Sequence, residues 1–496
     1  MSKNLILATL LISGSLFANP VPAPKKFIAI MGGGSEPADK ETTIFDDSMK
    51  NLGTFLNRGT AWTPTVSFNG GHTTTESVIA TGIGRRGVSN TPFTKEQYSK
   101  IIEDYKAKLN SGAIKSGDQL LVWIDTHGAI KADGETAHSI SAADGNAAAN
   151  LTTLAGAPLV KMDEMQSLID LAALKGVKLG IMDNSCHSGA SLALSNPNTC
   201  IVTASGPNHF GYSNWGSIMG GNLRAGKTLE DVFLETLNER DDAAFPMISS
   251  PVGKEIQDQL YPLATPFFYS YSDNPHHNKL SAFLEGQVIK NQCDQADASF
   301  QELLTFSQQV EEMVKPVGKS GPKYDVFRNA VSEYQILLEQ IRNDLTAMKL
   351  NDLEQVEPAP CAPFQSYYAD NTPAKLEEKC RMSGWTHKQM LALDWDGEIT
   401  RISNQQAAAV DPQTRSWLGT QVEWFRKSKV RTAEILAANP NYTTIKTYYS
   451  NLPALQERTR TLSSKVSLAT QKLYTDLYKA KSRADTRPNP CKSFVI

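Results

Sequence analysis

The chain has 496 residues, 40% of them apolar and 20% charged, and its formal net charge is -3 at pH 7. This length exceeds that of one ordinary hydrophobic core, so we expect two or more domains. The balanced charge excludes the basic excess of a nucleic-acid-binding protein and the acidic block of a solvating tail, so no nucleic-acid partner is expected.

The first 18 residues have the pattern of a signal peptide. Lys3 precedes an apolar run from Leu5 to Phe17, which closes on Ala18 and is followed by two prolines. The run is too short to span a bilayer, and no cysteine follows it for lipid attachment. The sequence therefore predicts cleavage after Ala18 and an exported protein, periplasmic or secreted, without a stable membrane anchor.

Strands and helices alternate through residues 19–290. Short apolar runs predict strands at 25–31, 65–68, 119–124, 177–182, 200–204 and 266–271. Apolar residues at helical spacing predict helices at 44–56, 94–109, 162–174 and 228–237, and a loop rich in Ser, Thr and Gly fills the stretch between residues 69 and 93. This order predicts an α/β domain with a mostly parallel sheet flanked by helices.

The glycines at 32–34 follow the first predicted strand. A dinucleotide-binding loop needs a further glycine and a P-loop needs a lysine, and both are missing here. We therefore interpret these glycines as a tight turn, and we expect no cofactor.

Residues 291–496 carry apolar stripes at helical spacing and predict an α-helical domain. The stripes run from Leu303 to Met313, from Phe327 to Met348 and from Leu455 to Leu477, and prolines at 358, 360 and 363 indicate a connection between helices. Asp411 and Pro412 have the pattern of a helix cap and first-turn proline. No catalytic constellation is found in this half, and binding of a protein partner is an open hypothesis for it.

Six cysteines are compatible with disulfides in an exported protein. Two lie in the first half, at 186 and 200, and four in the second, at 293, 361, 380 and 491. Four cysteines allow three pairings, and the sequence does not choose among them. We favour Cys361 with Cys380, which closes a short loop, and Cys293 with Cys491, which ties the ends of the helical domain together. No zinc-type spacing occurs, so no metal site is expected.

Two predicted strands end in residues whose side chains could take part in catalysis. The strand at 119–124 runs into Asp125, Thr126, His127 and Gly128, and the strand at 177–182 runs towards Cys186. The carboxyl ends of neighbouring parallel strands share one edge of a sheet, so this arrangement sets a thiol beside a base.

The chemistry that this pair could perform is acyl transfer. An imidazole can accept the thiol proton and later deliver one to a leaving amine, because the thiolate and not the thiol is the nucleophile. The backbone N–H groups of Gly128 and Cys186 could form an oxyanion hole, since Ser188 and Gly189 let the chain turn after the cysteine. The alternative is that both residues are structural, the cysteine as a small buried side chain and the histidine as a side chain with its hydrogen bonds made within the protein.

These two motifs, His127-Gly128 after one strand and NSCHSG from Asn184 to Gly189 after the next, resemble the caspase/legumain superfamily of cysteine peptidases. The CHSG core is the metacaspase form, while the signal peptide and the order of elements look nearer to the legumain-like branch. The resemblance covers residues 25–290 in pattern, with only the two short motifs specific. It implies a caspase-hemoglobinase fold, a dyad of His127 and Cys186, and an oxyanion hole from Gly128 and Cys186.

The resemblance also implies where the primary specificity pocket lies, with Thr203 and Ser205 near its wall. The metacaspase form has an aspartate two residues before the cysteine, which helps to hold a basic substrate side chain. This chain has Asn184 there, and its acid is Asp183, which should point to the opposite face of the strand. An amide-lined pocket suits asparagine or another neutral polar side chain better than a basic one.

Other histidines are weaker candidates. His187 is next to the cysteine in sequence and should point away from it, so His127 is preferred as the base. His72 and His138 are interpreted as loop residues, and His209 as a neighbour of the pocket. The polar segment 129–155 is expected to be a hairpin or loop and a possible site of self-processing.

The sequence leaves three functions open. The first is an exported cysteine endopeptidase that acts on a protein or peptide substrate. The second is a transpeptidase or ligase, in which the same dyad passes the acyl group to an amine instead of water. The third is a non-catalytic exported scaffold with a degenerate peptidase domain, against which the intact His127, Gly128 and Cys186 count.

Overall fold

A computed structural model describes most of the chain. The described residues are 23–34, 43–58, 61–68, 72–83, 88–143, 158–211, 214–239, 244–264, 301, 304–312, 322–348, 394–438 and 442–496. The predicted signal peptide, the strand at 266–271, the prolines at 358–363 and the proposed Cys361–Cys380 pair lie outside these ranges.

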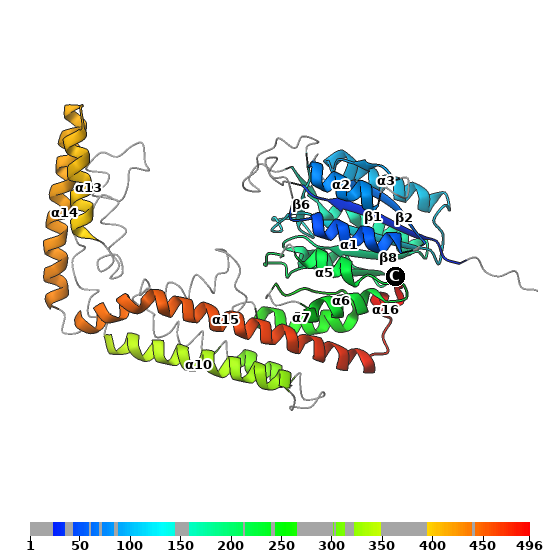
Figure 1. Cartoon of the computed structure of the whole chain (residues 1–496). Coiled ribbons are helices and arrows are strands. Elements are labelled where there is room, and N and C mark those ends of the chain that lie inside the picture. The colour runs from blue at the N-terminus through cyan, green and yellow to red at the C-terminus, as the bar shows by residue number, and fades with distance from the viewer. Residues whose placement is uncertain are drawn as a thin grey trace, which may run out of the picture.

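A six-stranded parallel sheet forms the core of the first half, in the order β3-β2-β1-β4-β8-β9 (Figure 1). Its strands are β1 (Lys26–Gly32), β2 (Trp62–Phe68), β3 (Asn90–Thr91), β4 (Gln119–Asp125), β8 (Lys178–Asp183) and β9 (Thr199–Thr203). Strands β1, β4, β8 and β9 are apolar and almost wholly buried, as expected for a sheet covered on both faces. The predicted mostly parallel sheet is confirmed.

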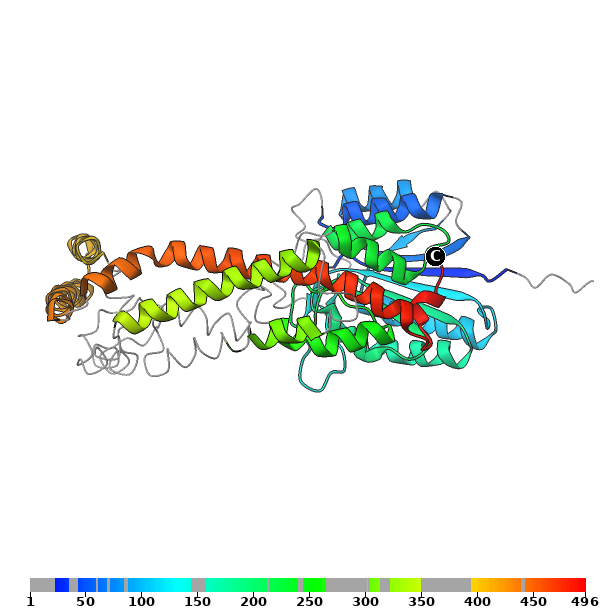
Figure 2. The ribbon, with the colours of Figure 1, turned by 90° about the horizontal axis from the view of Figure 1, so that it is seen from below.

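Helices cover both faces of the sheet (Figure 2). The helices α1 (Asp46–Asn57), α2 (Thr73–Gly82) and α5 (Asn214–Asn222) pack side by side on one face. The helices α3 (Lys95–Asn110) and α4 (Gln166–Leu174) pack against each other on the opposite face, because the chain reverses direction across the sheet after β3. The 3-10 helix η2 (Met162–Met165) leads into α4.

The predicted loop between residues 69 and 93 is wrong, because α2 forms there. Its residues Thr73–Gly82 are small and mostly polar, and only Thr75 and Ile79 are buried. Such a helix carries little apolar periodicity, so its sequence resembles a loop. The helices α6 (Leu229–Glu239) and α7 (Pro251–Ala264) follow β9, and only α6 was predicted.

A small antiparallel sheet lies beside the carboxyl edge of the large one. It joins β5 (Gly128–Ala129), β6 (Ser139–Ser141) and β7 (Leu159–Lys161). The hairpin predicted within 129–155 is therefore confirmed for its described part. The polar composition of this segment favours an exposed loop, but residues 137–142 are all buried.

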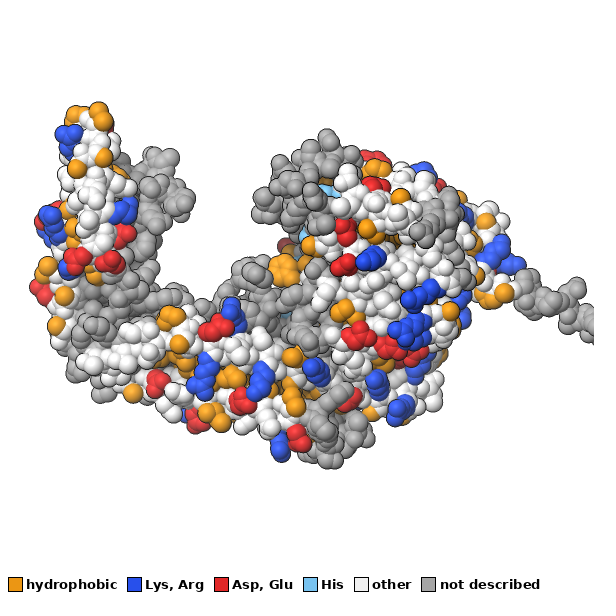
Figure 3. Space-filling view, viewed as in Figure 1, with side chains coloured by type: hydrophobic (Ala, Val, Ile, Leu, Met, Phe, Trp, Pro, Cys, Tyr) orange, Lys and Arg blue, Asp and Glu red, His pale blue; other side chains and the backbone are white. Residues whose placement is uncertain are grey.

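The second half is helical, as predicted. The long helices α10 (Pro322–Met348) and α15 (Tyr442–Ala484) lie side by side and extend away from the sheet, and α13 (Trp395–Ala408) and α14 (Pro412–Ala438) form a hairpin at their far end (Figures 1 and 2). Asp411 caps α14 as predicted, since its carboxylate accepts from Thr414 N–H at 2.7 Å. Charged side chains of both signs are interspersed over α10 and α15 (Figure 3).

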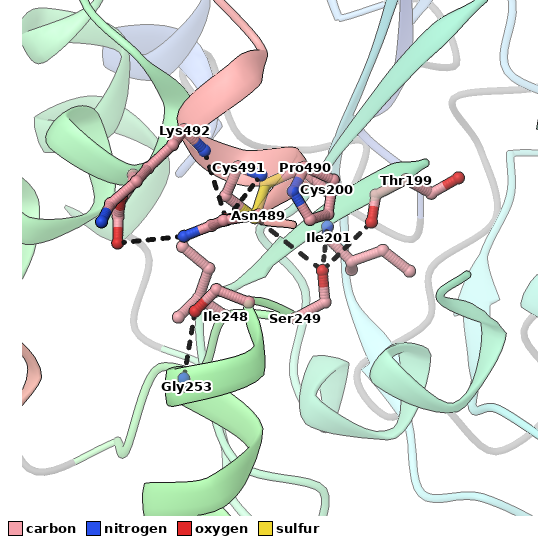
Figure 4. Close-up of a disulfide and its surroundings, with 12 residues drawn as sticks. Thr199, Cys200, Ile201, Ile248, Ser249, Gly253, Asn489, Pro490, Cys491 and Lys492 are labelled. Carbon is pink, nitrogen blue, oxygen red and sulfur yellow. Dashed lines mark hydrogen bonds between the residues drawn. A yellow bond between two sulfur atoms is a disulfide. The ribbon is translucent and has the colours of Figure 1, made fainter. Parts of the chain in front are cut away.

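The C-terminal segment, residues 489–496, returns to the sheet. It includes the short helix α16 (Pro490–Ser493), and Cys491 in this helix forms a disulfide with Cys200 of β9 (Figure 4). The predicted pairing of Cys293 with Cys491 is therefore wrong. The two cysteines are 291 residues apart, so the local sequence around either one does not indicate that they pair.

None of the helices in the described ranges combines the length and the apolar character that crossing a membrane would require.

Candidate active site

Strands β4 and β8 bring the two sequence motifs together. The two strands are parallel neighbours, and Ile124 pairs with Asp183, so both chains leave the sheet at the same edge. The backbone N–H of Asn184 donates to the carbonyl of Ile124 at 2.9 Å, which extends the contact one residue beyond β8. His127 and Cys186 therefore follow adjacent strand ends.

Gly128 lies directly against the backbone of Cys186. A Cβ atom at Gly128 would stand 2.0 Å from the carbonyl oxygen of Cys186 and 3.0 Å from its nitrogen. No side chain fits in that space, so only glycine permits this approach. The close contact places the residue after His127 beside the cysteine itself.

Cys186 sits in a tight turn, residues 184–187, between β8 and the 3-10 helix η3 (Ser188–Leu194). His187 has left-handed backbone with φ of 60°, which is uncommon for a residue with a side chain. Its N–H donates to the carbonyl of His209 at 2.8 Å, which holds this conformation. Cys186 is the partly exposed residue of the turn, while its neighbours are buried.

The thiol of Cys186 is held as a neutral group. Burial raises its pKa, and hydrogen bonds with the backbone of Gly211, Gly128 and Cys186 itself act in the opposite direction. The Sγ atom lies 3.6 Å from the carbonyl oxygen of Gly211. Because the pKa is raised, this thiol needs a base to become a nucleophile at neutral pH.

His127 is partly exposed and is flanked by the start of α1. The ring of Phe45 meets the imidazole edge-on, with 5.5 Å between ring centroids and 72° between planes. The backbone carbonyl of His127 accepts from Ser141 N–H of β6 at 2.8 Å, so the hairpin holds the main chain. Phe45 thus contacts the imidazole, the hairpin holds the main chain of His127, and part of the residue stays open to solvent.

Asp183, the last residue of β8, and Asn184, which follows it, differ in the hydrogen bonds that their side chains make. Asn184 is 7% exposed, and within the part of the chain that the structure describes neither its amide nitrogen nor its amide oxygen has a hydrogen-bond partner. Asp183 is fully buried, and its carboxylate accepts from both hydroxyl groups of Ser185 and Ser191, at 2.6 and 2.7 Å.

Thr203 is the last residue of the next strand, β9, and Ser205 follows it, and both are fully buried. The Thr203 hydroxyl donates to the carbonyl of Ser205 at 3.2 Å, and the Ser205 hydroxyl donates to the carbonyl of Ser185 at 3.5 Å. Ser205 thus lies against the Cys186 turn. Both hydroxyl groups bond to the protein's own backbone.

The remaining histidines have structural surroundings. His187 Nδ1 donates to the carbonyl of Pro207 at 3.1 Å, and His209 Nδ1 lies 2.9 Å from the hydroxyl of Tyr261. His72 is buried at the start of α2. His138 precedes β6 and is fully buried, and its ring reaches Ser185 and Ser191 beneath the Cys186 turn.

The position of His138 was missed by the sequence reasoning, as was Phe45 beside His127. The stretch around His138 reads KADGETAHS, and its polarity favours an exposed loop. One sequence signal for His138 is the pair of serines at 185 and 191, on either side of the candidate nucleophile. Buried hydroxyl groups need hydrogen-bond partners, and a histidine can be one.

Comparison of the chain with protein-family models and with curated proteins gave no match. Within the described ranges, no group of three or more His, Cys, Asp or Glu side chains is arranged to hold a metal ion.

Proposed function

We propose that this protein is an exported cysteine endopeptidase with a caspase-hemoglobinase-like catalytic domain and a helical C-terminal domain. The contact of Gly128 with the backbone of Cys186 carries the proposal, because it sets the histidine motif against the cysteine motif at one sheet edge. The Cys200–Cys491 disulfide favours an oxidising compartment, in agreement with export.

The reaction proceeds through a covalent acyl intermediate. His127 accepts the proton of the Cys186 thiol, and the sulfur attacks the carbonyl carbon of the substrate peptide bond. The N–H groups of Gly128 and Cys186 donate to the oxygen that becomes negative. His127 then gives its proton to the leaving amine, and water attacks the thioester with His127 as the base.

The specificity site is built around Asn184. Its buried amide has a donor and an acceptor with no partner among the described residues, which is costly unless a ligand supplies both. A neutral polar side chain such as asparagine or glutamine offers the complementary acceptor and donor. The carboxylate of Asp183 is held beneath the Cys186 turn by hydrogen bonds from Ser185 and Ser191, so it is not free to pair with a basic substrate side chain.

A thiol-directed activity probe tests the nucleophile. A peptide acyloxymethyl ketone with asparagine at its acyl position should label the wild-type protein at Cys186, and Cys186→Ala should abolish the label without changing the circular dichroism spectrum. Cys200 cannot substitute for it, because it is disulfide-bonded. Labelling that persists in the Cys186→Ala variant would overturn the assignment.

A matched pair of histidine variants tests the base. His127→Asn should lower kcat by about a hundredfold or more, the usual contribution of a positioned proton acceptor. His187→Asn is the control, since asparagine tolerates left-handed backbone, and it should retain most of the activity. Equal losses in the two variants would argue against His127 as the base.

Product analysis distinguishes hydrolysis from ligation. Cleavage of a peptide in the presence of an added amine nucleophile should yield the free acid for an endopeptidase, whereas a transpeptidase would yield the amide. A non-catalytic scaffold would give neither product, and the partial exposure of Cys186 argues against that alternative.

A further inference from the structure

A buried network of four side chains lies under the Cys186 turn, and the proposed reaction does not use it. Its members are Asp183 at the end of β8, Ser185 in the turn, Ser191 in η3 and His138 before β6, and all four are fully buried. Ser185 is also the residue directly before the proposed nucleophile.

The number of hydrogens that each group carries defines the direction of each hydrogen bond. The Ser185 hydroxyl donates to Asp183 Oδ1 at 2.6 Å, and the Ser191 hydroxyl donates to Asp183 Oδ2 at 2.7 Å. Each hydroxyl has only one hydrogen. The 2.8 Å contact between His138 Nε2 and the Ser185 oxygen therefore takes its hydrogen from the histidine.

His138 is thereby assigned as a neutral ring with its hydrogen on Nε2. The other ring nitrogen, Nδ1, is 3.3 Å from the Ser191 oxygen, a longer contact that no available hydrogen bridges. Burial lowers the pKa of His138, with Asp183, Glu135 and Asp163 acting in the opposite direction, and this agrees with the neutral form. Asp183 Oδ1 also accepts from the backbone N–H of Ser185, at 3.2 Å.

His138 belongs to the hairpin that carries the other half of the site. The next residue, Ser139, pairs with Ala129, and Ile140 pairs with Gly128. The hairpin itself is fixed at its base, since Asp163 accepts from Ala137 N–H at 2.7 Å. Movement of His138 therefore moves the strand that aligns Gly128.

We propose that His138 is a positioning residue that ties the hairpin bearing His127 and Gly128 to the turn bearing Cys186, through its Nε2–H bond to Ser185. This inference rests on the proposed function. Its physical content is that one buried bond joins the two chain segments that supply the base, the oxyanion donors and the sulfur. The pairing of β4 with β8 also joins the two segments, and His138 Nε2 lies 3.5 Å from Asp183 Oδ2, so the bond to Ser185 adds a short side-chain link to these contacts.

Three variants and one control test this role. His138→Met removes the bond with little change in length, His138→Gln offers an amide N–H in its place, and Ser185→Ala removes the acceptor. Thr236→Val in α6 is the control, because Thr236 is equally buried and hydrogen-bonded but lies outside the network.

The readouts separate positioning from stability. His138→Met and Ser185→Ala should each lower kcat by about ten- to a hundredfold, as expected for a small displacement of reacting groups, with KM changed less than about twofold. The loss in the double variant should be smaller than the product of the two single losses, since both single variants remove the His138–Ser185 bond, although Ser185→Ala also removes the bond to Asp183. His138→Gln should recover most of kcat. Thr236→Val should lower Tm without changing kcat.

Alkylation of Cys186 by iodoacetamide provides a readout that needs no substrate. The rate, followed by mass spectrometry of the Cys186 peptide across pH, gives the apparent pKa of the thiol. We expect that pKa to rise in His138→Met, because the backbone donors of Gly128 and Cys186 shift away, and to stay unchanged in Thr236→Val. Equal behaviour of His138→Met and Thr236→Val in this assay would overturn the inference. If the wild-type protein cleaves no peptide, the proposed function fails, and alkylation alone decides the role of His138.

Discussion

At the amino edge of the six-stranded sheet the C-terminal segment closes over the strand ends, whereas the carboxyl edge carries a buried amide, that of Asn184, with no partner among the described residues. Lys26 at the start of β1 donates to the carbonyl of Val495 at 3.2 Å, and Lys178 at the start of β8 donates to the carbonyl of Ser493 at 2.8 Å. The ring of Phe494 stacks on Trp62 in the same place.

The carboxyl edge is built differently. It holds an amide without partners at Asn184, a buried carboxyl group at Asp125 and left-handed backbone at His187. Each of these features lowers stability, and such costs collect where a protein binds or reacts. The contrast indicates that contacts at the amino edge stabilise the fold, whereas groups at the carboxyl edge lower its stability.

Removal of the disulfide should have the largest effect on this contrast. For a separation of 291 residues, the loop-closure model gives about 5–6 kcal/mol of lost stability when Cys200 and Cys491 are both replaced by serine. The measurement is urea denaturation followed by circular dichroism, in the Cys186→Ala background to prevent self-cleavage. The serine variant that retains Cys186 should have the same kcat as the wild-type protein, when the rate is expressed per folded molecule.

The disulfide lies at the amino edge, away from the site, so a fall in kcat of the folded protein would contradict the separation of roles. Dithiothreitol provides a second comparison, because it should destabilise the wild-type protein more than the serine variant, which lacks the Cys200–Cys491 bond.

A pH-dependent effect is expected next, at Asp125. Burial raises its pKa to about 7, with a hydrogen bond from Ser48 acting against the shift. The folded protein therefore holds a proton that the unfolded chain releases near pH 4, and stability falls as pH rises from about 4 to about 7. Asp125→Asn should remove this loss, so its advantage over the wild type should grow by about 3 kcal/mol between pH 5 and pH 8.

Asp118→Asn is the matched control at the amino edge. Its carboxylate is also buried, but it accepts from the backbone N–H groups of Lys25 and Lys115, at 2.8 and 3.0 Å. Urea denaturation at the two pH values should show no gain for this variant at pH 8. A gain of the same size as that of Asp125→Asn would break the contrast between the edges.

The smallest expected effect is at Asn184. Asn184→Leu should stabilise the protein by about 1 kcal/mol, because it replaces an unsatisfied buried amide by an apolar group of similar size. It should also reduce cleavage after asparagine. Asn222→Leu is the control, since Asn222 is equally buried but donates to Thr236 at 3.3 Å, and this variant should be less stable than the wild type. Thermal unfolding of both variants decides the sign.

Much of the sheet could be predicted from sequence, because its strands are short and apolar and end in polar clusters. The strands β1, β4 and β8 were recognised for this reason, and parallel order then placed the ends of β4 and β8 together. The helix α2 was missed because its small polar residues carry no stripe. The partner of Cys491 was missed because a contact over 291 residues leaves no local pattern.

The candidate site divides in a similar way. His127, Gly128 and Cys186 follow strand ends, so topology alone indicates their neighbourhood. His138 comes to the same place through a hairpin whose pairing depends on tertiary contacts with β7 and with Asp163. Sequence reasoning has no access to that packing, and a histidine in a polar stretch is interpreted as exposed.

The covalent link between β9 and α16 also bears on how the protein could mature. A break in the main chain anywhere between Cys200 and Cys491 would leave two polypeptides joined by their sulfur atoms, with the last residues still seated on the sheet. The helical region could thus be nicked by another protease without being shed. Such a two-chain form would migrate as a single species until a reductant is added.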